Sequence, residues 1–167
     1  FNSYGPGEVP GQYRNVIPNF IYWAMKGQPL PITGDGKMTR DFTYVEDIVD
    51  ALLRAGVREE AIGQEMNIAS AAETEIVEMA NTVNDLIGNK AGLLFTDRRK
   101  WDTKSRLLAS IDKAKNLLGY NPQTTFEEGL DKTIHWFKGN WDNINRDAEF
   151  PPGMSSAVKN YVIKQEQ

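Results

Sequence analysis

The basic side chains with the most informative spacing are Arg40, which directly precedes Asp41, and Arg99, which stands three residues before Asp102. Guanidinium groups bind phosphate and pyrophosphate oxygens through paired, charge-assisted hydrogen bonds. Local basic residues could therefore bind a small phosphate ligand. The simpler alternative is that Arg40 and Asp41 form a surface ion pair, which contributes little to stability, and that Arg99 lies in a solvated basic stretch at residues 98–100.

Other kinds of chemistry are disfavoured by what the sequence lacks. With zero cysteines it can form no thiolate metal site, no disulfide and no cysteine nucleophile. His135 is the only histidine, which rules out a multi-histidine zinc site. A hydrolase built on His135 would need a serine in a Gly-x-Ser-x-Gly elbow, and the sequence contains none. We therefore expect no metal ligands and no catalytic residues of these classes.

Size and charge narrow the class of protein further. The chain has 167 residues, enough for one domain with a core, and a formal net charge of −4. It shows neither the basic stripe of a nucleic-acid binder nor an apolar run near the roughly 20 residues of a membrane helix, so we expect no nucleic acid and no membrane as a partner. The absence of cysteine fits a cytoplasmic protein. Because the first methionine is Met25, we do not expect residue 1 to be a natural translation start.

Strand and helix signals alternate along the chain. Pro18 suits the first turn of a helix and Gly27 its exit, whereas Thr125 and Glu128 form a capping box. Residues 34–37 are a strong turn signal, and the segment after residue 140 has no clear periodicity. The periodicity predicts helices at about residues 18–27, 46–58, 74–87, 112–118 and 126–139, and short strands at 30–33, 41–45, 66–69 and 93–95. This mixture indicates an α/β or α+β fold without a complete doubly wound domain.

Several short motifs occur in an order and spacing typical of one family. They are Phe-Asn-Ser-Tyr-Gly-Pro at residues 1–6, Asn-Val-Ile-Pro at 15–18, Gly-Gln-Pro-Leu at 27–30, Gly-Asp-Gly at 34–36, Arg-Asp-Phe-Thr-Tyr-Val-Glu-Asp at 40–47, Arg-Lys-Trp-Asp at 99–102, Leu-Leu-Gly-Tyr-Asn-Pro at 117–122 and Glu-Gly-Leu at 128–130. Each motif is weak alone, but the series is specific. The chain resembles the C-terminal, substrate-binding portion of the extended short-chain dehydrogenases/reductases, the NAD-dependent epimerase/dehydratase family, and is similar to UDP-glucose 4-epimerases.

The resemblance covers roughly residues 1–140 and implies an α/β fold. That fold would comprise a C-terminal substrate-binding lobe together with the remaining strands and helices of a truncated Rossmann-type NAD-binding domain. The resemblance divides the chain into a nucleotide-sugar-binding portion at residues 1–140 and a C-terminal extension of unknown role at residues 141–167.

The resemblance also implies a binding site for a nucleoside diphosphate sugar. In it, Arg40 and Arg99 would clamp the pyrophosphate, and Asp102 would accept hydrogen bonds from the ribose hydroxyls. The other residues that match the family's substrate contacts are Asn2 and Asn15 (phosphate or sugar), Val16, Pro31 and Thr33 (the last two lining the nucleobase) and Phe42 (near the ribose). The asparagines could instead be turn or cap residues, and Asp102 could cap a local turn. Trp101 departs from the small residue that the family commonly has there.

Two parts of the family's chemistry have no acceptable match in these 167 residues. The glycines at residues 34–36 are followed by Lys-Met-Thr rather than by a third glycine and a helix, so they do not form a glycine-rich dinucleotide loop. The family's catalytic Tyr-x-x-x-Lys, in which lysine lowers the tyrosine pKa, has a literal match at Tyr22 and Lys26. We interpret that match as coincidental because it lies on a helix of the substrate-binding portion. We therefore expect no catalytic residues and no cofactor bound by this chain alone, although the intact family uses NAD.

Three functional interpretations follow from this resemblance. The first is the nucleotide-sugar-binding portion of an NAD-dependent epimerase or dehydratase, inactive alone and completed by a missing N-terminal NAD-binding half. The second is a stand-alone binding or assembly module that self-associates through surfaces that the missing half would cover. The third is a fragment with no function of its own.

Overall fold

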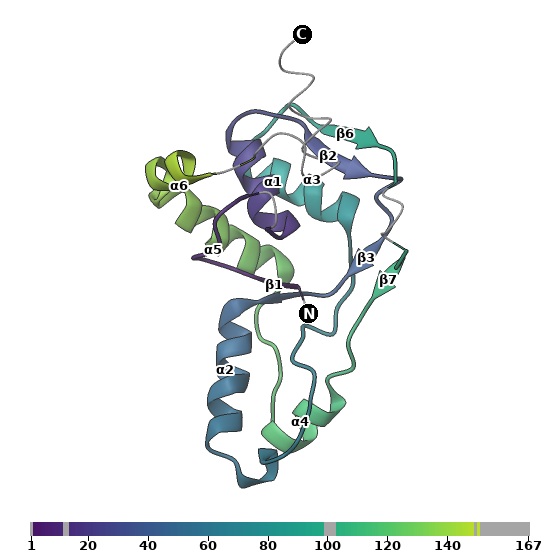
Figure 1. The fold of residues 1–167 in the computed structure, drawn as a ribbon, viewed down its shortest axis with the longest axis vertical. Helices are drawn as coiled ribbons and strands as arrows, with labels where there is room; N and C mark the ends of the chain where they lie inside the picture. Colours follow the sequence, from purple (N-terminus) through teal and green to yellow (C-terminus); the bar gives the residue numbers. More distant parts are fainter. Residues whose placement is uncertain (1, 12–13, 99–102, 149, 151–167) are drawn as a thin grey trace.

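The computed structural model describes residues 2–11, 14–98, 103–148 and 150. The helices are α1 (Val16–Met25), α2 (Val45–Gly56), α3 (Ile76–Ile87), α4 (Asp112–Leu118), α5 (Phe126–Gly139) and α6 (Trp141–Asp147), with a 3-10 turn, η1, at Glu59–Ala61. The strands are β1 (Asn2–Tyr4), β2 (Leu30–Thr33), β3 (Thr39–Arg40), β4 (Phe42–Tyr44), β5 (Thr74–Glu75), β6 (Leu93–Thr96) and β7 (Arg106–Leu107). The described part is elongated, with α1, α3, α5 and α6 together with β2 and β6 at one end, α2 and α4 at the other, and β1, β3 and β7 nearer the middle (Figure 1).

The strands form small sheets whose neighbours are distant in sequence. Strand β1 pairs with β4 and β2 pairs with β6, both in parallel. Strand β3 is the centre of a three-stranded sheet, antiparallel to β5 and parallel to β7. Parallel pairing requires a crossover connection, and here helices lie in the connections between paired strands. The expected α/β class is confirmed.

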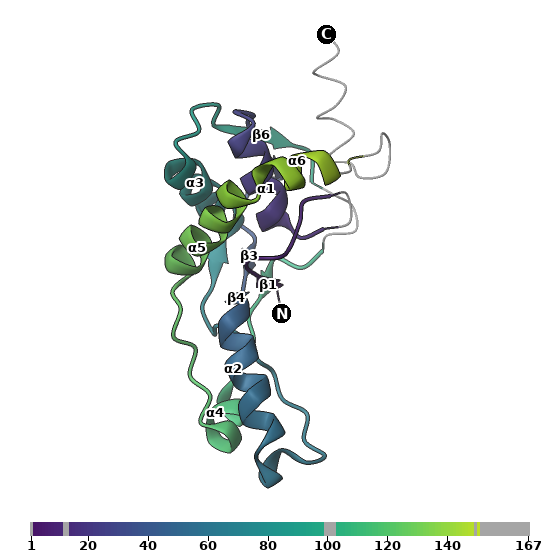
Figure 2. The same cartoon turned by 90° about the vertical axis from the view of Figure 1, so that its left-hand side faces the viewer.

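The larger core lies at the end of the molecule that carries α1, α3, α5 and α6 (Figures 1 and 2). Helix α1 is apolar on nearly all sides, which is typical of a buried helix, and its residues from Ile17 to Ala24 are buried. Phe137 and Ile144 bring α5 and α6 into the same core. Strands β1, β2 and β4 also contribute buried side chains to this core, among them Tyr4, Leu30 and Phe42.

A smaller core lies at the opposite end, between α2 and α4 (Figures 1 and 2). Ala51 of α2 meets Ala114 and Leu118 of α4, and the buried Tyr120 hydroxyl donates to the Ala69 carbonyl at 2.9 Å. Burial raises the pKa of Tyr120 to about 12. The opposite side of α2 stays uncovered, with the large apolar side chains Leu52 62%, Leu53 69% and Val57 84% exposed.

Most expected elements are confirmed. The capping box at Thr125 opens α5, since Thr125 Oγ1 accepts from the Glu128 amide at 3.3 Å while the Glu128 carboxylate accepts from the Thr125 amide at 3.0 Å. The expected turn at residues 34–37 is also present, because Gly34 and Gly36 adopt positive φ angles of 70° and 73°.

The expected strand at residues 66–69 is wrong. Residues 66–69 pair with no strand within the described part of the chain, and the Ala69 carbonyl accepts a hydrogen bond from the Tyr120 hydroxyl instead. The segment after residue 140, where no periodicity was visible, contains α6. This helix is short, and only Ile144 of its residues is buried, which explains why the apolar pattern was too sparse to detect.

No helix in the described ranges is both long enough and apolar enough to cross a membrane.

Candidate functional site

Arg40 lies on the central strand of the three-stranded sheet. It pairs with Thr74 of β5 on one side and with Leu107 of β7 on the other. Its side chain is half-buried, and its Nη1 atom donates to the Thr39 carbonyl at 2.8 Å. The Arg40 guanidinium therefore lies against the backbone of its own strand.

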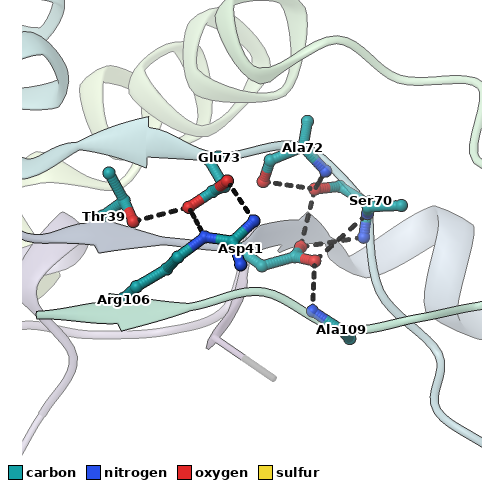
Figure 3. A network of polar contacts seen from close by, with 8 residues as sticks. Thr39, Asp41, Ser70, Ala72, Glu73, Arg106 and Ala109 are labelled. Carbon is teal, nitrogen blue, oxygen red and sulfur yellow. Dashed lines mark hydrogen bonds and ion pairs between the residues drawn. The ribbon is translucent and has the colours of Figure 1, made fainter. Parts of the chain in front are cut away.

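Asp41, which follows Arg40, is fully buried and tied to two other segments of the chain (Figure 3). Its carboxylate accepts from the Ser70 amide at 2.9 Å, the Ser70 hydroxyl at 2.6 Å, the Ala71 amide at 3.1 Å and the Ala109 amide at 3.4 Å. The charge is thus met by backbone and hydroxyl donors. Asp41 is therefore a structural anchor, which rules out the alternative of an ion pair between two surface side chains.

The anchoring loop bends sharply at Ala71. This residue has a φ of 57°, a left-handed conformation that non-glycine residues rarely adopt, and it is the one non-glycine residue with positive φ among those described. The bend turns the amides of residues 70 and 71 toward the Asp41 carboxylate.

A second polar cluster lies at the same sheet and joins Glu73, which precedes β5, to Arg106 of β7 and Thr39 of the central strand β3 (Figure 3). The Glu73 carboxylate accepts from Arg106 Nε and Nη2, each at 2.8 Å, and from the Thr39 hydroxyl at 2.7 Å. The hydrogen bonds from Arg106 hold the pKa of Glu73 below its usual range, and the same bonds raise the pKa of Arg106. The Glu73 side chain therefore adds a side-chain link between β3 and β7 to the backbone pairing of these strands.

Asn2 and Phe42 lie beside Arg40 in space. The Asn2 side-chain amide and backbone amide both donate to the Asp41 carbonyl, at 3.2 and 3.3 Å. Phe42 is 5% exposed and packs edge-on to Tyr4, with the ring of Phe126 on another side. The structure thus links Asn2 to the residue that follows Arg40, and it places the Phe42 ring in the protein core.

Asn15 and Val16 open helix α1. Asn15 is exposed, makes no side-chain cap bond, and donates from Nδ2 to Glu8 Oε1 at 2.8 Å. Val16 is half-buried against the larger core. The alternative role of Asn15 as a side-chain cap is therefore not supported.

Pro31 and Thr33 lie on β2, where Pro31 is buried and Thr33 is half-buried. Thr33 pairs with Thr96 at the end of β6. The two remaining predicted contacts, Arg99 and Asp102, lie outside the described residues.

Sequence reasoning missed Ser70, Glu73, Arg106 and Ala109. Each makes its contact with a residue about 30 or more positions away, for example Arg106 with Glu73 and Ala109 with Asp41. The spacing of residues in a single sequence does not predict contacts between segments so far apart. The one available signal was the run of small polar and apolar residues at 69–72, which permits a sharp bend but does not specify it.

The Tyr22 and Lys26 pair lies away from Arg40, against α6. Tyr22 is 8% exposed, its hydroxyl donates to Asn145 Oδ1 at 3.2 Å, and its ring stacks on Phe150 at 5.5 Å between centroids. Lys26 Nζ lies 5.5 Å from the centre of the Tyr22 ring. The tyrosine contributes to packing and to a hydrogen bond between helices.

Metal-binding side chains do not gather anywhere in the described ranges, where no group of three or more histidine, aspartate or glutamate residues is arranged to hold an ion. His135 is exposed on α5.

Comparison with known proteins gives consistent matches. Residues 1–69 match the sequence profile of the NAD dependent epimerase/dehydratase family. A UDP-N-acetyl-alpha-D-glucosaminuronate decarboxylase of Bacillus cytotoxicus is 35% identical over 143 residues, which are 83% of this chain and 44% of the decarboxylase. Among solved structures, an epimerase of Methanothermobacter thermautotrophicus is 59% identical with a TM-score of 0.88, over 90% of this chain and 45% of that one.

The Bordetella bronchiseptica enzyme WbmF, solved in complex with NAD+ and UDP, is 33% identical with a TM-score of 0.74, over 98% of this chain and 49% of WbmF. The chain thus spans less than half the length of each of these relatives.

Proposed function

Because the chain belongs to the NAD-dependent epimerase/dehydratase family, we propose that it binds a nucleoside diphosphate sugar and serves as the nucleotide-sugar-binding portion of such an enzyme. The observation that carries this proposal is the placement of Arg40 on the central strand of a three-stranded sheet, with Asn2 bonded to the carbonyl of the next residue, Asp41. A charged fork on a rigid strand suits a pyrophosphate. Relatives named or solved with UDP or UDP-sugars support the ligand class.

Asp41 contributes to this site without contacting the ligand. Its carboxylate is engaged by the amides of Ser70, Ala71 and Ala109, so its negative charge is balanced inside the protein. A ligand at Arg40 would then bind beside a carboxylate whose hydrogen bonds are already made within the protein.

We propose further that this chain turns over no substrate alone. NAD supplies a hydride acceptor in family enzymes, but the sequence holds no glycine-rich dinucleotide loop, so its residues do not fit that cofactor. The Tyr22 hydroxyl is engaged with Asn145, which does not suit it to act as a base. In this proposal an NAD-binding half contributes the cofactor and the base, and this chain orients the sugar nucleotide.

A second candidate function is a module that self-associates. The observation that favours it is the uncovered apolar stripe of α2, formed by Val49, Leu52 and Leu53 of the helix and by Val57 directly after its end. Either an NAD-binding half or a second copy would bury this stripe.

A thermal-shift series separates these functions. We expect UDP-, dTDP- or GDP-sugars to raise the melting temperature, and Arg40→Ala to abolish the rise, because ligand that binds only the folded state stabilises it by mass action. If no nucleotide raises the melting temperature, the binding function is wrong. NAD-dependent turnover by this chain alone would contradict the proposal that it is inactive by itself.

A further inference from the structure

The cluster of Glu73, Arg106 and Thr39 has the geometry of a brace. Arg106 presents Nε and Nη2 to the two Glu73 oxygens, each at 2.8 Å, in a bidentate pair, while the Thr39 hydroxyl adds a third bond at 2.7 Å. Such a fork defines orientation as well as distance. Replacing the arginine by lysine would keep the charge but lose the fork.

The brace holds a sheet that has little backbone ladder of its own. Strands β3, β5 and β7 are each 2 residues long, so few main-chain bonds can connect them. Among these few, the Thr39 amide donates to the Ser105 carbonyl at 2.9 Å. The Glu73 carboxylate adds one side-chain bond to β3, from Thr39, and two to β7, from Arg106.

The brace and Arg40 lie on opposite faces of β3. Successive side chains of a strand point to opposite faces, so Thr39 and Arg40 diverge. Figure 3 shows Thr39, Glu73 and Arg106 together on one face, with the Asp41 cluster beside them. The brace thus stands behind the strand that presents Arg40, and it can act on a ligand only through the backbone.

We propose that Glu73 and Arg106 are positioning residues for Arg40, which fix β3 so that its guanidinium is presented to the diphosphate of a nucleotide. This inference rests on the proposed function and assigns to that site two residues that do not contact the ligand. Binding energy for the diphosphate, but not for the nucleoside, depends on the brace.

The test is a double-mutant cycle on UDP affinity measured by calorimetry. We expect Glu73→Gln to weaken UDP binding about three- to tenfold, and to have almost no further effect in an Arg40→Ala background, because both changes act on the same contact. Arg106→Lys, a milder change, should weaken UDP binding in the same non-additive way. Uridine, which lacks the diphosphate, should bind wild type and Glu73→Gln equally.

Glu46→Gln is the matched control. It removes an exposed glutamate–lysine pair, with Lys132 at 3.4 Å, between α2 and α5, and it should leave UDP affinity unchanged. Equal UDP affinity of wild type and Glu73→Gln, or additive effects of Glu73→Gln and Arg40→Ala, would overturn the positioning role while leaving the proposed function intact. Failure of wild type to bind UDP would instead contradict the proposed function, and the positioning role with it.

Discussion

Asp41 is the residue whose loss should damage the centre of the molecule most. It is fully buried, and its carboxylate satisfies amides of two loops, at Ser70 and Ala109 among others. Removing it leaves several buried donors without an acceptor, so we expect Asp41→Ala to lower the free energy of unfolding by about 3 to 5 kcal/mol. Urea denaturation followed by circular dichroism measures this.

Asp50→Ala is the control for Asp41→Ala. Asp50 pairs with Arg54 one turn along α2, but both side chains are about half exposed, at 48% and 42%. The change should cost about 0.5 kcal/mol or less. Equal losses for the two variants would show that Asp41 is not an anchor.

Glu73 gives a prediction about pH. Because hydrogen bonds from Arg106 lower the pKa of Glu73 in the folded state, its carboxylate stabilises the fold above its ordinary pKa of 4.5, and that contribution is lost as pH falls through the lower folded pKa. The difference in unfolding midpoint between wild type and Glu73→Gln should therefore be present at neutral pH and shrink well below pH 4.5. A difference that does not change with pH would contradict this.

The sequence alone indicated the candidate ligand-binding residues but not the residues that hold them in position. Arg40 and Asn2 could be singled out because they stand in recognisable motifs, and the structure places them side by side through Asp41. Glu73 and Arg106 could not, because a surface glutamate and arginine 33 residues apart resemble any other charged pair until the chain is folded. Whether Arg99 and Asp102 join Arg40 is still a prediction, since both lie outside the described residues.

Among the elements, α5 shows what local sequence can define. The capping box at Thr125 was visible in the sequence because it is made within four residues, and the helix begins where it predicts. We expect Thr125→Ala to destabilise the protein by about 1 kcal/mol, measured by thermal or urea denaturation. Thr82→Ala is the control. The Thr82 hydroxyl donates to the Glu78 carbonyl within α3, and its removal should leave the free energy of unfolding nearly unchanged.

The short strands β3, β5 and β7 show what local sequence cannot define. Each has 2 residues, too few for an alternating pattern, and each exists because a distant segment lies beside it. The reverse error occurred at residues 66–69, where an apolar run predicted a strand that lacks a partner. In both cases tertiary contacts, rather than propensity, decided the outcome.

Helix α2 carries the apolar stripe that should determine association. If the chain is studied alone, we expect it to self-associate, and Leu53→Glu to reduce association without lowering the unfolding midpoint, because Leu53 is 69% exposed. Sedimentation velocity measures this. Leu86→Glu, at a 39% exposed leucine on α3, should leave association unchanged. A wild-type chain that stays monomeric at high concentration would contradict the role of the stripe.

On the scale of the whole molecule, the chain matches less than half the length of its relatives, and its sequence provides no dinucleotide loop. The division proposed from sequence, with residues 141–167 as an extension, stays a prediction, although Ile144 of α6 packs into the larger core. The described part is built as one elongated body with two cores joined by the short strands that carry Arg40 (Figures 1 and 2).

The most direct test of the central claim is calorimetric titration of UDP into three proteins: wild type, Arg40→Ala and Arg146→Ala. Arg146 forms an exposed pair with Asp147 on α6 and serves as the matched control. We expect wild type to bind, Arg40→Ala to bind at least about tenfold more weakly because a charge-assisted contact is lost, and Arg146→Ala to match wild type. Equal affinity of wild type and Arg40→Ala, or no binding by wild type at all, would contradict the account.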